Sequence, residues 1–157
     1  MNDLLKKEVL KFLTDQKVGV VSTISENRPN GAYIYYIVDE NLDIYFTTVV
    51  STRKHKNIAL NVNVAFTVGT IKPPKTVQIE GLAEVVTDEN TLKALTALYA
   101  NIVTENNHYP VPLTKLDWQQ GVVMYRIRPT WLKWSNFASA KGKTDQGVSL
   151  VLINKEK

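Results

Sequence analysis

The sequence predicts a mainly β protein in which six antiparallel strands form a closed or nearly closed barrel with flanking helices. Runs rich in β-branched and aromatic residues recur along the chain, short turn-forming connections separate them, and only two or three segments show helical periodicity. Closure is favoured because it removes exposed strand edges, and an open α+β sheet is the structural alternative. The 157 residues suit a single domain, 1–157.

The first predicted elements are a helix and three strands. Residues 1–16 predict a short amphipathic helix whose apolar side chains share one face. These side chains are Leu5, Val9, Phe12 and Leu13. Strands are predicted at 18–24, 33–38 and 42–48, divided by turn-forming residues at 27–31 and 39–41. The short connections indicate an antiparallel meander.

The middle of the chain predicts one helix and two strands. Residues 53–60 show no β alternation and follow a hydroxyl residue, the preferred helix N-cap. Strands are expected at 64–70 and 76–86, because the paired prolines between them interrupt a continuous ladder. Gly81 within the second of these strands indicates a bulge or a close approach by a ligand or the backbone.

The last third predicts a helix and a bent strand. Asp88 can cap a helix that runs to about residue 105, with an apolar stripe that belongs to the core. A polar, proline-bearing loop at 106–112 precedes a strand at 122–127, which continues past Pro129 to 131–134. The tail, 138–157, carries an apolar run at 148–153 that we expect to pair with another segment.

The residue inventory excludes several classes of chemistry. The chain has no cysteine, so disulfides, thiolate metal sites and cysteine nucleophiles are excluded, and a cytoplasmic location is expected. Two histidines without a ligand-pair motif argue against a metal site. No phosphate-binding glycine loop or hydrolase nucleophile motif occurs either. We expect no membrane span and no export signal, since no long apolar run is present.

The charge distribution argues against nucleic acid as a partner. The net charge is +4, but 19 basic residues are offset by 15 acidic ones spread along the chain. Residues 53–56 form the single basic cluster, and no run of five basic residues occurs. Most of the positive charge is therefore expected to belong to a solvated surface.

Residues 47–56, TTVVSTRKHK, end a predicted strand and begin a helix whose first turn is basic. Cations at a helix N-terminus oppose the helix dipole by about 0.3–1 kcal/mol each, and a bound anion would reverse that effect. The hydroxyls of Ser51 and Thr52, the cations of Arg53 and Lys54, and the free N–H groups of the first turn together predict a phosphate site. The alternative is a solvated basic face with a plain cap.

Aromatic residues on the neighbouring strands are candidates for packing beside a planar ring, although each is also an ordinary core residue. They are Tyr33, Tyr35, Tyr36, Tyr45 and Phe46.

The arrangement resembles the pyridoxamine 5'-phosphate oxidase family, the flavin-binding split β-barrels. The resemblance covers roughly residues 18–134 and is strongest at IYFTT (44–48), Ser51 with the following basic pair, NIALN (57–61) and VQIEGLAEV (77–85). It implies a homodimer with two molecules of flavin mononucleotide (FMN) at the subunit interface. The implied cofactor-binding residues are Thr47, Thr48, Ser51, Thr52, Arg53, Lys54 and Gln78. The aromatic run 33–36 and the apolar tail independently favour a two-fold dimer that buries both, with Trp131 and Trp134 as candidate contributors from the opposite chain.

The resemblance implies a flavin-dependent oxidoreductase that acts on a small-molecule substrate or accepts electrons from a donor such as NAD(P)H. Deazaflavin and haem are alternative cofactors, and a flavin or haem binding module without turnover is the alternative function. The resemblance to the true oxidase fails at two places. That enzyme has an arginine early in its second strand, for the phosphate, and an arginine-bearing C-terminal motif, for the substrate. Residues 33–38 and 131–134 stand there instead, which argues against oxidation of vitamin B6.

Overall fold

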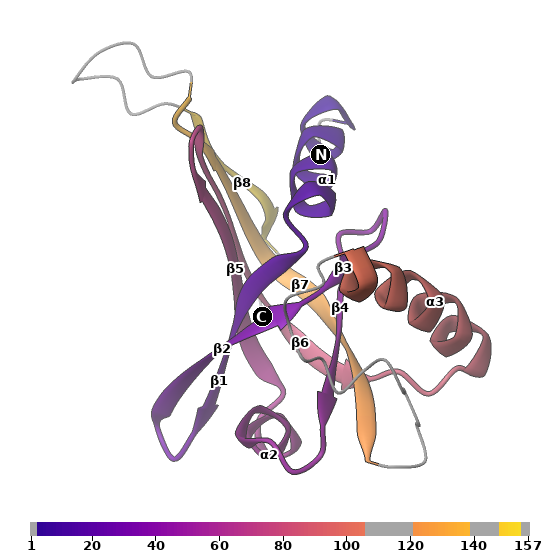
Figure 1. Ribbon diagram of the computed structural model, residues 1–157. Helices are drawn as coiled ribbons and strands as arrows, with labels where there is room; N and C mark the ends of the chain where they lie inside the picture. Colours follow the sequence, from indigo (N-terminus) through magenta and orange to yellow (C-terminus); the bar gives the residue numbers. More distant parts are fainter. Residues whose placement is uncertain (1–2, 106–120, 139–147, 155–157) are drawn as a thin grey trace.

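The computed structural model describes residues 3–105, 121–138 and 148–154. These residues form one strongly curled antiparallel sheet with helices around it (Figure 1), which confirms the mainly β prediction. Within them the sheet has eight strands rather than the predicted six. The elements are α1 (Asp3–Gln16), β1 (Val18–Ser25), β2 (Arg28–Tyr35), β3 (Ile37–Val38), β4 (Ile44–Val49), α2 (Arg53–Leu60), β5 (Asn63–Ile71), β6 (Pro74–Val85), α3 (Glu89–Glu105), β7 (Val122–Asn136) and β8 (Val148–Asn154).

The strand order explains why the sheet curls. The order is β2-β1-β5-β6-β7-β4-β3, with β8 paired to β7 outside this path. β2 and β3 lie at opposite ends of this order although only Tyr36 separates them in the chain. Because neighbouring Cα atoms are about 3.8 Å apart, the two ends of the sheet must meet, and the sheet forms a split barrel. Among the described strands β4 pairs with β3 only at Ile44 and Tyr45, which leaves a split between β2 and residues 47–49 that we call the seam.

The second strand differs from its prediction at both ends. Residues 28–31, expected in a loop, belong to β2 and pair with β1. The turn shrinks to Glu26 and Asn27, whose φ angles of 50° and 60° are left-handed. Such a two-residue turn matches the twist of paired strands, so the hairpin extends further than composition indicated. The predicted strand 33–38 was wrong as one element, because Tyr36 divides it.

Gly81 lies at a register shift between β6 and β7. A Cβ atom placed on it would lie 2.5 Å from the carbonyl oxygen of Arg128, closer than any side chain tolerates. The predicted bulge and the close backbone approach are both confirmed. β7 passes the bulge as one bent strand, as predicted from Pro129.

The main core fills the inside of the curled sheet and extends under α1. Val9, Phe12 and Leu13 of α1 are buried, and the Phe12 ring lies 5.0 Å from that of Trp134. This confirms the predicted apolar face of the first helix, with Leu5 at its half-buried margin. It also places Trp134 inside its own chain at 1% exposure, so the expectation that it contacts an opposite chain is wrong.

α3 lies outside the sheet against β3 and β4 (Figure 1). A separate, smaller cluster holds it there, made by Ile37, Tyr45 and Tyr99. Asp88 accepts a hydrogen bond from the backbone N–H of Thr91 at 2.7 Å, which confirms the predicted cap. The apolar run of the tail forms β8 and pairs with β7, as expected of it. The predicted loop 106–112 lies outside the described residues.

Candidate functional site

A hollow of about 200 Å³ lies at the seam, between β2, β4 and the start of α2. We call it the seam hollow. Its polar and aromatic walls are Thr47, Thr48, Thr52, Lys54, Tyr33, Tyr35 and Tyr99. The structure therefore brings four of the predicted site residues together, the three threonines and the lysine.

The start of α2 is fixed to the end of β4 by threonine hydroxyls. Thr52 is the N-cap, and its Oγ1 accepts from the backbone N–H of His55 at 3.4 Å. The same hydroxyl donates to the carbonyl oxygen of Val49 at 2.8 Å and lies 2.9 Å from Thr48 Oγ1. Because the Thr52 proton is used on Val49, Thr48 is the donor in the second contact. The cap is Thr52, and Ser51 is an exposed turn residue.

Two contacts that sequence reasoning missed attach α2 to strands β1 and β7. Asn57 is buried and its Nδ2 donates to Thr23 Oγ1 on β1 at 2.9 Å. His55 Nδ1 lies 2.9 Å from the hydroxyl of Tyr125 on β7. The only local signal was a polar Asn57 beside Ile58 on the buried face of a short helix. These contacts fix the position from which Lys54 reaches the seam hollow.

Lys54 supplies the charge of the seam hollow. Its side chain is half-buried, and burial lowers its pKa from the ordinary value. No aspartate or glutamate lines the hollow among the described residues, and Lys54 forms no ion pair there. A half-buried cation without a counter-charge is unfavourable, so an anionic ligand would stabilise it.

Thr47 adds an unpartnered hydroxyl. Its side chain is 5% exposed, and its Oγ1 makes no hydrogen bond with any residue that the structure describes. The hydroxyl of Tyr99 lies close to it but donates its proton to the carbonyl oxygen of Tyr35 at 2.9 Å. Leaving such a buried group unpaired costs about 1–3 kcal/mol. Thr47 is therefore available to donate to a ligand.

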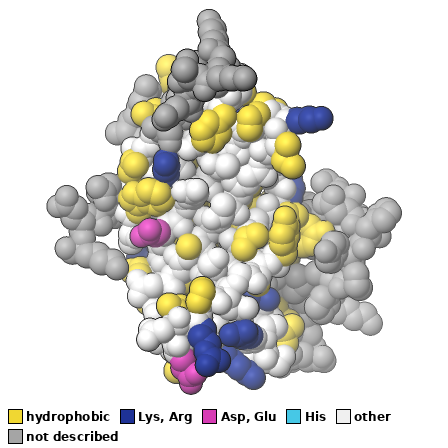
Figure 2. Space-filling model, turned by 90° about the vertical axis from the view of Figure 1, so that its left-hand side faces the viewer, with side chains coloured by type: hydrophobic (Ala, Val, Ile, Leu, Met, Phe, Trp, Pro, Cys, Tyr) yellow, Lys and Arg dark blue, Asp and Glu magenta, His cyan; other side chains and the backbone are white. Residues whose placement is uncertain are grey.

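Basic side chains also gather outside the hollow. Arg53 and Lys56 are exposed on α2, and Arg28 is exposed at the β1–β2 turn. The space-filling view shows lysine and arginine side chains gathered at the lower end of this face, where these elements lie (Figure 2). The second strand thus does carry an arginine, contrary to the sequence interpretation, but Arg28 does not line the seam hollow.

Of the other residues predicted near a flavin ring, most lie outside the lining of the seam hollow. Tyr33 stands at the hollow with 76% of its surface exposed, whereas Tyr36, Tyr45 and Phe46 are buried. Gln78 is exposed on β6 and lies outside the lining of the hollow. One chain therefore does not bring Gln78 to the other predicted residues.

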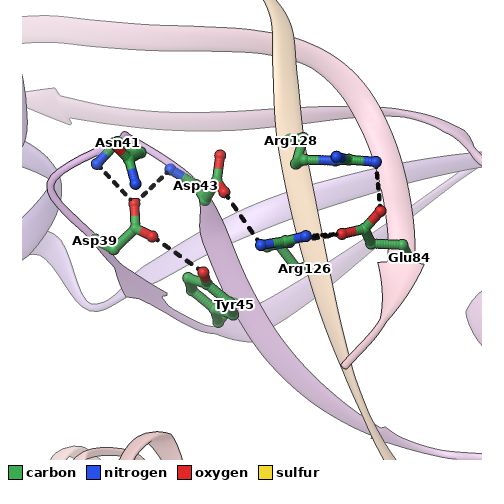
Figure 3. Close-up of polar contacts among 7 residues, drawn as sticks. All are labelled: Asp39, Asn41, Asp43, Tyr45, Glu84, Arg126 and Arg128. Carbon is green, nitrogen blue, oxygen red and sulfur yellow. Dashed lines mark hydrogen bonds and ion pairs between the residues drawn. The ribbon is translucent and has the colours of Figure 1, made fainter. Parts of the chain in front are cut away.

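A second group of polar side chains lies near β4, and its members bond to one another (Figure 3). Its role is to stabilise the fold. Asp39 Oδ1 accepts from the backbone N–H groups of Asn41 and Asp43 at 2.8 and 3.0 Å. Its Oδ2 accepts from the Tyr45 hydroxyl at 3.0 Å. These bonds fix the turn between β3 and β4.

Glu84 completes this polar group by bridging two arginines. It accepts from Arg126 Nε at 2.7 Å, and its other oxygen lies 2.6 Å from Arg128 Nη2. Arg126 also lies 3.9 Å from Asp43 (Figure 3). The charges satisfy one another, which distinguishes this group from the uncompensated Lys54.

The part of the chain that the structure describes holds no membrane-spanning helix and no cluster of metal-binding side chains. None of its helices combines the length and the apolar composition needed to cross a bilayer. No three histidine or carboxylate side chains gather there closely enough to hold a metal ion.

The curled sheet, the seam and the hollow define a split-barrel protein. The sequence model of pyridoxamine 5'-phosphate oxidase matches residues 5–134, so the chain belongs to that family. This confirms the resemblance predicted from the sequence. None of the curated proteins compared with the chain matched it.

Solved structures share the fold at low sequence identity. General Stress Protein 26 from Bacillus anthracis is 20% identical with a TM-score of 0.66, and the match covers 94% of this chain and 98% of that one. An FAD-binding protein from Mesorhizobium loti is 18% identical with a TM-score of 0.62, covering 84% and 92%. A heme binding protein from Mycobacterium smegmatis is 14% identical with a TM-score of 0.71, covering 94% and 57%. At these identities the likeness concerns the fold alone.

Proposed function

We propose that this chain binds FMN through its phosphate in the seam hollow and is a flavin-dependent oxidoreductase. The observation that carries the proposal is Lys54, a half-buried cation in a hollow whose described lining holds no acidic residue. A terminal phosphate supplies the missing negative charge and accepts several hydrogen bonds at once. Family membership supports the choice of ligand.

The residues present fit a phosphate group. Thr47 has an unpartnered hydroxyl, and the N-terminus of α2 offers free backbone N–H groups beside Thr52 and Lys54. Arg53 lies between Thr52 and Lys54 in the chain, is exposed, and adds positive charge. Tyr33 and Tyr35 give the hollow aromatic walls beside which a planar ring can pack.

A bound flavin would supply hydride or electron transfer, with a small-molecule substrate and a donor such as NAD(P)H as reaction partners. The chain's own residues would bind and orient it. The first test is a titration of the purified protein with FMN and with riboflavin, which lacks the phosphate. We expect FMN to bind at least about a hundredfold more tightly, the range of two charge-assisted hydrogen bonds. Equal affinities would remove the phosphate site from the proposal.

A homodimer is part of this proposal. Paired residues place Tyr33, Val20, Thr67, Gln78, Lys133 and Val151 in one row across the outer face of the sheet. Tyr33 and Val151, at its two ends, are 76% and 52% exposed. A second copy covering this row would shield these groups and bring a second Gln78 toward the hollow.

The alternative is a flavin or haem binding module without turnover. A heme binding protein with the same fold supports this alternative. Mixing the flavin-loaded protein with NADH or NADPH distinguishes the two functions. Bleaching of the flavin spectrum over repeated cycles supports the oxidoreductase, and an unchanged spectrum supports the binding module.

A further inference from the structure

Tyr99 is the one described residue of α3 that lines the seam hollow. Only 2% of its surface is exposed, whereas the neighbouring Leu98 is 52% exposed. The other walls come from β2, β4 and α2, which belong to the barrel itself. The helix thus contributes to the hollow through a single phenol.

The phenol spans the seam. It donates to the carbonyl oxygen of Tyr35 at the end of β2 and lies against Thr47 on β4. The backbone N–H of Val50 donates to Gly121 beside β7 at 2.8 Å, and alternate residues of a strand face opposite neighbours. The backbone of Thr47 therefore faces the seam. Tyr99 therefore contacts both sides of the seam within the lining of the hollow.

A second hollow of about 270 Å³ is lined by residues next in the chain to those of this contact. Its lining includes Tyr36 and Ile37, which follow Tyr35 in the chain, and Leu98, which precedes Tyr99. Consecutive residues thus line two different hollows. The chain segments 35–36 and 98–99 therefore lie between the two hollows.

We propose that Tyr99 is a specificity-determining residue that makes the seam hollow end blind. A terminal phosphate, such as that of FMN, fits a closed hollow. A phosphate esterified on both sides, as in FAD, needs space beyond it for the second half of the molecule, and the phenol occupies that space. This inference rests on the proposed FMN site.

The test compares the dissociation constants of FMN and FAD for the parent, Tyr99→Ala and Tyr99→Phe. We expect the parent to prefer FMN by more than about tenfold, because a filled pocket rejects added bulk. Tyr99→Phe retains the ring and should retain the preference, whereas Tyr99→Ala should lose it. Tyr33→Ala removes a tyrosine from the exposed side of the same hollow. This variant should weaken the binding of FMN and of FAD by a similar factor and leave the ratio of their dissociation constants unchanged.

Thermal unfolding establishes that each variant is folded, and Tyr99→Leu replaces Tyr99→Ala if the latter does not fold. A folded Tyr99→Ala or Tyr99→Leu protein that keeps the parental ratio overturns the role of Tyr99, and so does a parent that binds FAD as tightly as FMN. A parent that binds neither flavin overturns the proposed function itself, and the inference with it.

Discussion

Asn57 Nδ2 donates a hydrogen bond of 2.9 Å to Thr23 Oγ1 in the buried contact between α2 and β1. The two side chains are 4% and 2% exposed. Thr23→Val removes the acceptor and leaves the Asn57 amide buried without it, so we expect a loss of about 1–3 kcal/mol in the free energy of unfolding. Denaturant unfolding measures it. Thr87→Val, at an exposed position between β6 and α3, is the control, and equal effects of both variants would contradict the prediction.

The basic residues of α2 should differ in their contribution to FMN binding. Lys54→Ala removes the half-buried cation, and we expect it to weaken binding by about 1.5–3 kcal/mol, as for a charge-assisted hydrogen bond. Arg53→Ala should cost less than about 1 kcal/mol, because exposed charges are screened by water. Lys56→Ala, exposed on the same helix, should leave binding unchanged. Calorimetric titration decides the order, and a Lys54→Ala protein that binds like the parent would make Lys54 a solvated residue.

FMN affinity should depend on pH in two directions. Burial lowers the pKa of Lys54 in the free protein, and a bound phosphate would favour the charged form and raise that pKa again. Affinity should therefore fall as the pH rises through the lowered pKa, because binding then requires uptake of a proton. It should also fall below about pH 6, where the phosphate gains a proton. In Lys54→Met, affinity should still fall at acidic pH but no longer at alkaline pH. If the alkaline loss of affinity persists, a group other than Lys54 causes it.

The proposed dimer predicts a solution mass of twice 17.7 kDa in light scattering at micromolar concentration. Added FMN should oppose dissociation on dilution, because a ligand stabilises the state that binds it. Val151→Asp places a charge at one end of the exposed row and should promote dissociation, as should truncation after Ser139, which removes residues 140–157. Leu4→Asp, at an exposed apolar position on α1, is the matched control. A monomer fully loaded with FMN would refute the interface.

The mainly β fold was predictable because strand patterns and turn residues are local signals. The seam was not. It depends on the single residue Tyr36 between β2 and β3, and on β4 finding its partner in β7 far along the chain. The extent of β2 was missed for a different reason. Glu26 adopts a left-handed conformation that its residue type does not announce.

Prediction of the candidate site had the same limits. Thr47, Thr52 and Lys54 lie within one strand-to-helix segment, so their order in the sequence already indicated a phosphate site. Tyr99 approaches from a helix whose apolar stripe indicated only core packing. The partners of Asn57 and His55 are 34 and 70 residues away, and no short pattern relates such positions.

The dependence of β4 on β7 also bears on when the protein can first function during its synthesis. The seam hollow takes its hydroxyls, its cation and two of its tyrosines from residues 33–54, but β4 pairs along its length with residues 122–127. A nascent chain that has not yet released β7 from the ribosome holds these groups without the strand that aligns them. Ligand capture would then coincide with completion of the sheet, and flavin would protect finished chains from proteolysis while leaving truncated ones susceptible.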